Sequence, residues 1–187
     1  MFEILKNIDS KLLLFLNGFH SDFLDTVMFQ ITKFWFWYPV VALIIFLLIK
    51  KFKKKFWIPL ILIVCCFALT DIGSNIAKKN FKRYRPTYNL EIKNEVHVVK
   101  EYRGGEYGFF SGHAANSFGL AIISLLFIRK RWYSILVLSW AVLVSFSRIY
   151  LGVHYPADIF VGAVFGIFIS VLIYFSQNKF TSQSKIC

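Results

Sequence analysis

Acidic residues and cysteines are scarce in this sequence. Only 10 of its 187 residues are Asp or Glu, against 22 Lys or Arg, which gives a formal net charge of +12 at pH 7. The three cysteines are Cys65 and Cys66, adjacent in an apolar stretch, and Cys187 at the end of a polar tail. They form neither a paired disulfide set nor a zinc-binding pattern. No repeat, low-complexity linker, cleavable signal or soluble domain is visible, so we expect one domain over residues 1–187.

Long apolar runs dominate the chain. Hydrophobic residues make up 57% of it and aromatic residues 19%, with a mean hydropathy of +0.59. Because a run of about 20 apolar residues can cross a bilayer, the sequence predicts an all-α, polytopic bundle of five to six transmembrane helices. We expect the first span to begin early, near Phe23. The five clear runs are Phe34–Ile49, Phe56–Ala77, Ala114–Ile128, Tyr133–Phe146 and Ile159–Phe175.

Residues 1–20 show a different pattern. Apolar residues recur at helical spacing on one face, and charged residues occupy the other. This pattern predicts an interfacial amphipathic helix that is too polar to span a membrane comfortably. The apolar positions are Phe2, Leu5, Ile8, Leu12 and Phe15, and the charged positions are Glu3, Lys6, Asp9 and Lys11.

Basic residues lie in the connectors between the apolar runs. Residues 50–55 carry five lysines, and residues 129–131 are all basic. Short basic connectors favour the cytoplasmic side. The small size of the chain suits a bacterial protein, so we expect an integral protein of the bacterial inner membrane. Parity then places Lys78–Phe110 and Ser147–Pro156 together on the extracytoplasmic face, although the longer of these loops is itself basic. This distribution suits membrane topology and an anionic substrate better than nucleic acid.

Three polar clusters fall at that expected face. In residues 78–86, KKNFKRYRP, Lys78 and Arg85 can bind one phosphate, or the run is a basic patch that contacts lipid headgroups. In residues 110–119, FSGHAANSFG, Ser111 predicts a helix N-cap with His113 in the first turn. There Gly112 lets an oxyanion approach the backbone, or the segment is an ordinary cap.

The third cluster is residues 147–158, SRIYLGVHYPAD. Pro156 predicts a helix start that places His154 near the carboxylate of Asp158. Either Asp158 only stabilises the helix N-terminus and Arg148 reaches to the interface, or both are functional. Charged residues within spans are costly and usually mark function.

Together the clusters favour phosphoryl transfer. A neutral imidazole oriented by a carboxylate can attack phosphorus, a second histidine can protonate the leaving oxygen, and cations stabilise the transition state. The polar residues Asn116 and Ser117 either join the site or pack inside the bundle, and Gly162 and Gly166 form a G-x-x-x-G suited to close helix packing.

The pattern Lys78–x6–Arg85–Pro86, Ser111–Gly112–His113 and Ser147–Arg148–x5–His154–x3–Asp158 resembles the three-part signature of the type 2 phosphatidic acid phosphatases. The resemblance implies the helical bundle of the acid phosphatase and vanadium-dependent haloperoxidase superfamily, with no cofactor and no metal. It also implies that His154 is the nucleophile that forms a phosphohistidine, Asp158 its orienting partner and His113 the general acid. Phosphate binding is implied for Lys78, Arg85, Ser111, Gly112 and Arg148. Phe110 departs from the family, which often has proline there.

The resemblance implies a membrane lipid phosphate as substrate. We expect undecaprenyl diphosphate, with lipid A phosphate, phosphatidylglycerophosphate and phosphatidate as alternatives. The loop Thr87–Phe110 is expected to contact the headgroup. Two rival readings are a non-enzymatic transporter or scaffold that binds anionic lipid, and an enzyme whose metal is held by His113, His154 and Asp158, which the density of cations argues against. The loop residues in question are Glu91, Glu95, His97, Glu101, Arg103, Glu106 and Tyr107.

Overall fold

The computed structural model describes residues 2–183, and all the regular elements in this range are helices. Cys187 lies outside the described residues. The seven α-helices are α1 (Phe2–Asn17), α2 (Asp22–Ile31), α3 (Tyr38–Phe52), α4 (Trp57–Phe81), α5 (Gly112–Ile128), α6 (Arg131–Tyr150) and α7 (Pro156–Gln183). Four short 3₁₀ turns are η1 (Phe34–Phe36), η2 (Lys53–Lys55), η3 (Pro86–Tyr88) and η4 (Val99–Glu101).

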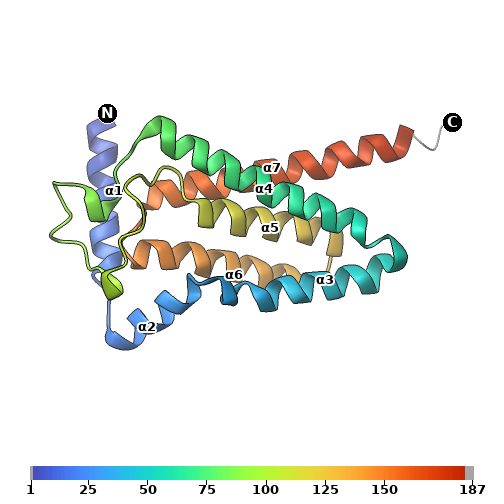
Figure 1. Ribbon diagram of the computed structural model, residues 1–187, viewed down its shortest axis with the longest axis horizontal. Coiled ribbons are helices and arrows are strands. Elements are labelled where there is room, and N and C mark those ends of the chain that lie inside the picture. The colour runs from blue at the N-terminus through green and yellow to red at the C-terminus, as the bar shows by residue number, and fades with distance from the viewer. Residues whose placement is uncertain (1, 184–187) are drawn as a thin grey trace.

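Helices α3 to α7 run along the length of the molecule, whereas α1 lies across one end (Figure 1). Helix α5 is central and packs against α4, α6 and α7. Two glycines of α7 permit this packing: a Cβ at Gly162 would lie 2.6 Å from the Ser111 carbonyl oxygen, and one at Gly166 would collide with the Ala115 carbonyl. The predicted packing role of the G-x-x-x-G is confirmed.

The predicted helical membrane bundle is confirmed. Within the described residues, four helical segments are long and apolar enough to cross a membrane, and α5 is a shorter apolar helix of 17 residues at their centre. The four are Phe34–Lys55, Trp57–Phe81, Arg131–Tyr150 and Pro156–Gln177.

The prediction that the first span begins near Phe23 is wrong. Helix α2 ends at Ile31, where the Thr32 hydroxyl donates to the Phe29 carbonyl, and a new helix begins at Tyr38. Pro39 lies in the first turn of α3. Proline suits that position because it lacks the N–H that would continue a preceding helix. The chain between Thr32 and Trp37 therefore separates two helices.

Helix α1 occupies the place predicted for an amphipathic helix, and its apolar residues Leu5, Ile8, Leu12 and Phe15 are exposed. Asp9, which the sequence placed among the charged residues of the other face, is buried against the bundle. The face of α1 that touches the protein therefore carries a carboxylate, and the reason for this lies in the site below.

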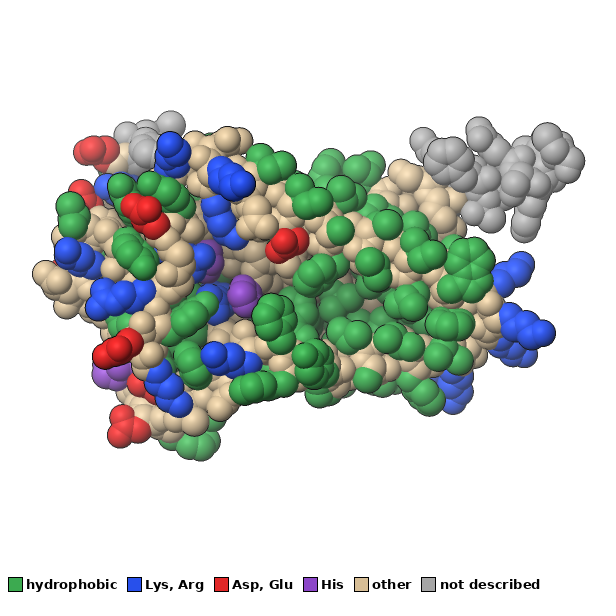
Figure 2. Space-filling model, in the orientation of Figure 1, with side chains coloured by type: hydrophobic (Ala, Val, Ile, Leu, Met, Phe, Trp, Pro, Cys, Tyr) green, Lys and Arg blue, Asp and Glu red, His purple; other side chains and the backbone are tan. Residues whose placement is uncertain are grey.

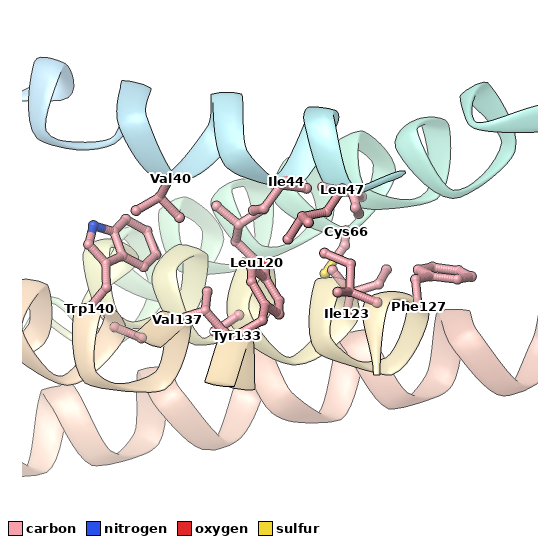
Figure 3. Packing of buried hydrophobic residues seen from close by; sticks show 14 of the residues in the cluster. Val40, Ile44, Leu47, Cys66, Leu120, Ile123, Phe127, Tyr133, Val137 and Trp140 are labelled. Atoms are coloured by element: carbon pink, nitrogen blue, oxygen red, sulfur yellow. The ribbon is translucent and has the colours of Figure 1, made fainter. Parts of the chain in front are cut away.

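The bundle core is formed by aliphatic and aromatic side chains from several helices. Val40 and Ile44 of α3 point toward Leu120 of α5 and Val137 of α6 (Figure 3). Other large apolar side chains face outward along the bundle, as lipid-facing surfaces allow, and Lys and Arg gather at both ends (Figure 2). The connectors at residues 50–55 and 129–131 share one end, and the two polar loops share the other (Figure 1). The prediction that the two polar loops lie on the same side of the bundle is confirmed.

Candidate active site

Backbone hydrogen bonds bring the three polar clusters together at one end of the bundle. The two ends of the long loop pair with each other: Arg85 N–H donates to the Glu106 carbonyl at 3.0 Å, and Gly108 N–H donates to the Arg83 carbonyl at 2.9 Å. Ser111 N–H donates to the Asp158 carbonyl at 3.0 Å, which ties the start of α5 to the first turn of α7. The predicted site residues therefore converge.

Three cations of the site have no carboxylate partner. Within the described residues, no Asp or Glu oxygen lies in ion-pair range of Lys78, Arg85 or Arg148. Arg148 is only 2% exposed, and its Nε and Nη1 have no hydrogen-bond partner in the part of the chain that is described. Buried, uncompensated cations are costly, so this group is suited to bind a multiply charged anion.

The start of α5 contributes a second feature for anion binding. The Ser111 hydroxyl caps the helix by accepting from Ala114 N–H at 3.4 Å, as predicted. Gly112 follows, and a Cβ there would lie 3.3 Å from the Lys78 ammonium and 2.9 Å from the Ser74 hydroxyl. A cation and the positive end of a helix therefore meet at Gly112, where the lack of a side chain leaves space beside them.

His154 lies in a tight turn between α6 and α7. Gly152 has a positive φ of 66°, and Val153 N–H donates back to the Arg148 carbonyl at 3.1 Å. The His154 ring is buried, with Nδ1 3.6 Å from the Asp158 Oδ2 oxygen. This is longer than a hydrogen bond, as catalytic contacts often are without substrate. Burial, and then the charges of Arg85 and Arg148, lower the pKa of His154 well below its usual value, so the ring is neutral near pH 7.

Asp158 is held by a cation that the motif does not include. Arg83 Nη1 donates to Asp158 Oδ1 at 2.7 Å, and Tyr155 N–H donates to Oδ2 at 3.1 Å. The Arg83 guanidinium also lies 4.0 Å from the centre of the Tyr155 ring. Burial opposes the charge of Arg83, but the nearby carboxylates Asp158 and Asp9 outweigh it and raise the pKa of the guanidinium.

Asp9 of α1 completes this arrangement. Its Oδ2 accepts from Arg83 Nη2 at 2.6 Å, and its Oδ1 accepts from Ala157 N–H at 2.9 Å, at the N-terminus of α7. Sequence reasoning missed both Arg83 and Asp9. Arg83 stands inside the quoted basic run, but nothing near it in the sequence indicates a partner 74 residues away.

His113 lies in the first turn of α5, as predicted. Its ring meets Trp37 edge-on, with ring centres 6.4 Å apart, and it is close enough to Arg148 for the charge of that guanidinium to act on it. The second histidine of the motif thus shares the site with the first. Ser117 instead contacts Ser145 and the Ala114 carbonyl, inside the bundle.

The long loop covers the site. The Tyr102 hydroxyl accepts from Arg148 Nη2 at 3.1 Å, and a Cβ at Gly108 would lie 3.5 Å from His154 Nδ1. Two residues expected to contact a headgroup pair within the protein instead: Glu91 with Lys6 at 3.2 Å and His97 with Asp25 at 2.9 Å. Histidine and basic side chains gather in a recess near this end, beside hydrophobic side chains (Figure 2).

The donors required by the metal alternative do not assemble. Within residues 2–183, no three His, Cys, Asp or Glu side chains come together in a group that could hold a metal ion. His154 is directed instead at Asp158, and cations surround the pair. A neutral imidazole, an orienting carboxylate and unpaired cations are the parts that phosphoryl transfer requires.

Comparison with known proteins points to the same chemistry. A lipid A 4'-phosphatase from Bacteroides thetaiotaomicron is 42% identical over 190 residues, which cover 98% of this chain and 83% of that protein. Another lipid A 4'-phosphatase, from Porphyromonas gingivalis, is 32% identical, with 92% of this chain and 74% of that protein covered. An undecaprenyl-diphosphatase from Sulfolobus acidocaldarius is also 32% identical, with 91% and 75% covered.

The crystal structure of Aquifex aeolicus LpxE superposes with a TM-score of 0.71 at 25% identity, covering 88% of this chain and 93% of that one. Fold, site and relatives together define a helical membrane phosphatase. The family model described as PAP2 superfamily matches residues 59–182, a range that contains every predicted site residue. The chain belongs to the PAP2 superfamily.

Proposed function

We propose that this phosphatase hydrolyses a membrane lipid phosphate through a phosphohistidine on His154. The observation that carries the proposal is the buried His154–Asp158 pair, which faces three cations without carboxylate partners in the described chain. Asp158 lies on the Nδ1 side of the ring, which leaves Nε2 free to attack phosphorus. Lys78, Arg85, Arg148 and the start of α5 at Ser111 and Gly112 bind the phosphate oxygens.

The reaction has two steps. In the first, the Nε2 lone pair of His154 forms a bond to phosphorus, the bond from phosphorus to the leaving oxygen breaks, and His113 gives that oxygen a proton. In the second, water attacks phosphorus and gives its proton to His113, the P–N bond breaks, and inorganic phosphate leaves. His154 returns to its neutral form with its Nδ1 proton still directed at Asp158.

For the substrate we propose lipid A phosphate. The 42% identity over 83% of a lipid A 4'-phosphatase favours it over undecaprenyl diphosphate, which the sequence had led us to expect first. The relative that acts on undecaprenyl diphosphate by name is less similar, at 32% identity. Lipid A is an acylated glucosamine disaccharide, so the leaving group would be a sugar hydroxyl.

We further propose an orientation in a bacterial inner membrane. The basic connectors at residues 50–55 and 129–131 favour the cytoplasmic side, which directs the site to the extracytoplasmic surface. Helix α1 crosses the site end with Leu5, Ile8 and Phe15 exposed, so it would lie in the membrane interface.

A substrate panel tests the function. The purified full chain, in detergent with EDTA, is given lipid A, undecaprenyl diphosphate, phosphatidylglycerophosphate and phosphatidate, and inorganic phosphate is measured. We expect the highest kcat/KM on lipid A and acid-labile, base-stable phosphate on the wild-type protein but none on His154→Gln. Activity retained by His154→Gln would refute the mechanism, and loss with EDTA would favour the metal alternative. If nothing in the panel is turned over, the lipid-binding alternative replaces the enzyme.

A further inference from the structure

One acidic side chain of the span α4 is exposed without an ion-pair partner. Asp71 lies within Trp57–Phe81, where the neighbouring outward residues Ile72 and Ile76 are apolar. No Lys, Arg or His nitrogen of the described chain is in ion-pair range of its carboxylate. A carboxylate is costly at this depth, and such residues usually face a functional path.

The Asp71 carboxylate is connected to the phosphate-binding group by amides. Its Oδ2 accepts from Asn75 Nδ2 at 3.0 Å, and the oxygen of the same Asn75 amide lies 3.5 Å from the Lys78 ammonium. Its Oδ1 accepts from Asn116 Nδ2 at 3.3 Å, and Asn116 Oδ1 accepts from the Thr70 hydroxyl at 2.7 Å. Each oxygen of the Asp71 carboxylate thus has one donor. Because an ionised carboxylate can accept about four hydrogen bonds, Asp71 can accept further ones from a bound molecule.

These side chains lie on the leaving-group side of the proposed reaction. Asn116 comes one helical turn after His113, the residue that protonates the leaving oxygen, and Asp71 comes two turns before Lys78. One turn before Asp71 in α4, and so farther from the site end of the bundle, Phe67 packs edge-on against Trp37, with ring centres 6.1 Å apart. From the site end of the bundle inward, α4 therefore presents the Lys78 ammonium, the Asn75 amide, the Asp71 carboxylate and the Phe67 ring, in that order.

We propose that Asp71, Asn75 and Asn116 form a subsite that binds hydroxyl and amide N–H groups of the leaving group. The inference rests on the proposed function and narrows it: the preferred substrate is a lipid whose phosphate is esterified to an acylated amino sugar. A polyprenyl chain offers no donor, so the remaining acceptor positions of the Asp71 carboxylate would stay unfilled. Sites built to hydrogen-bond a substrate reject analogues that lack the donor.

The test compares two substrates in the full-length protein. For wild type and Asp71→Asn, kcat/KM is measured on an acylated glucosamine phosphate and on undecaprenyl diphosphate. In Asp71→Asn we expect kcat/KM on the glucosamine phosphate, divided by kcat/KM on undecaprenyl diphosphate, to fall by about 10- to 100-fold relative to wild type. This is the effect of losing a hydrogen bond to a charged acceptor. Asn75→Ala should shift the ratio in the same direction, and Asp71→Glu should restore part of it. Asp22→Asn removes the same charge from an exposed position of α2 and should leave the ratio unaltered.

Three outcomes would overturn the subsite. If Asp71→Asn lowers kcat/KM equally on both substrates, Asp71 serves to hold α4 against α5. If neither Asp71→Asn nor Asn75→Ala changes kcat/KM on either substrate, Asp71 has no role in selectivity. A wild-type protein that hydrolyses undecaprenyl diphosphate but no sugar phosphate refutes the subsite while the phosphatase function stands. Only failure on every lipid phosphate refutes the proposed function as well. Thermal unfolding of each variant separates misfolding from altered selectivity.

Discussion

Arg83 holds Asp158 on the side opposite His154. Its Nη1 is 2.7 Å from Asp158 Oδ1, while Asp158 Oδ2 is the oxygen that faces His154 Nδ1. The guanidinium therefore fixes the rotation of the carboxylate and keeps one oxygen turned toward the imidazole. In a site where three other cations lie near the ring, this contact keeps Asp158 directed at His154 instead of at one of those cations.

Replacing Arg83 should lower catalysis more than binding. We expect Arg83→Gln to reduce kcat by about 10- to 100-fold with a small change in KM, because it removes a hydrogen bond between charged groups that is worth about 1.5–3 kcal/mol. Arg83→Lys should recover only part of the loss, since an ammonium cannot reach two carboxylates with a planar fork. Lys82→Gln, at the exposed neighbouring position, is the control. A rise in KM alone would show that Arg83 binds substrate instead.

Asp9 should act through Arg83. In Asp9→Asn the contacts with Arg83 and with Ala157 N–H weaken, and we expect a smaller kcat loss of about 3- to 10-fold, in line with one partly exposed hydrogen bond. In the double variant with Arg83→Gln, the two losses should not add, because the residues share one network. The kcat of each variant is measured in the same detergent. If the loss in the double variant equals the product of the two single losses, Asp9 acts outside this network.

The His154 ring should stay neutral at mildly acidic pH. Burial and the charges of Arg85 and Arg148 lower its pKa, so the ring should not titrate at its ordinary value near 6.5. Nitrogen NMR of the histidine-labelled protein, with the His154 signal assigned from His154→Gln, measures this directly. A transition near pH 6.5 would contradict it.

The same pKa shift predicts how stability depends on pH. The unfolded chain takes up a proton at His154 near pH 6.5, whereas the folded chain does not until lower pH. The contribution of neutral His154 to the free energy of unfolding is therefore complete above about pH 6.5 and declines as the pH falls below it. Compared with His154→Gln, the wild type should lose more thermal stability between about pH 6.5 and pH 5. Equal losses in both would count against the lowered pKa.

Arg148 should govern phosphate affinity. Its Nε and Nη1 have no partner among residues 2–183, and lysine supplies no planar fork to replace them. We expect Arg148→Lys to raise the inhibition constant of inorganic phosphate by about tenfold or more, the cost of one charge-assisted hydrogen bond. Arg103→Lys, a conservative change at an exposed arginine of the long loop, is the matched control. If the inhibition constant of phosphate is unchanged in Arg148→Lys, Arg148 instead serves to hold the long loop through its hydrogen bond to Tyr102.

The sequence is sufficient to predict the helical bundle and the positions of those site residues that lie at the ends of helices. Ser111, His113 and Asp158 stand where cap and first-turn rules put them, because those rules depend on neighbouring residues alone. Contacts between distant segments were beyond those rules. Asp9 and Arg83 meet across 74 residues, and Tyr102 reaches Arg148 across 46.

Two further signals are present in the sequence. Pro39 marks the start of a helix and so separates α2 from α3, which the hydropathy of the region concealed. Asp71 is an acidic residue inside a predicted span, a position that by itself indicates function. Both are local features of the sequence, because each is a single residue that departs from the apolar run around it.

Helix α7 is the last of the described helices, and Asp158 lies in its first turn. A growing chain that has reached Tyr155 already possesses both histidines and the cations proposed to bind phosphate, yet it lacks the carboxylate proposed to orient His154. Asp9, made at the beginning of synthesis, has no Ala157 N–H to accept from until the same moment. The contacts of Asp158 with Arg83 and His154 therefore form only after the first turn of α7 has been made, so the proposed site is completed late in the synthesis of the described chain.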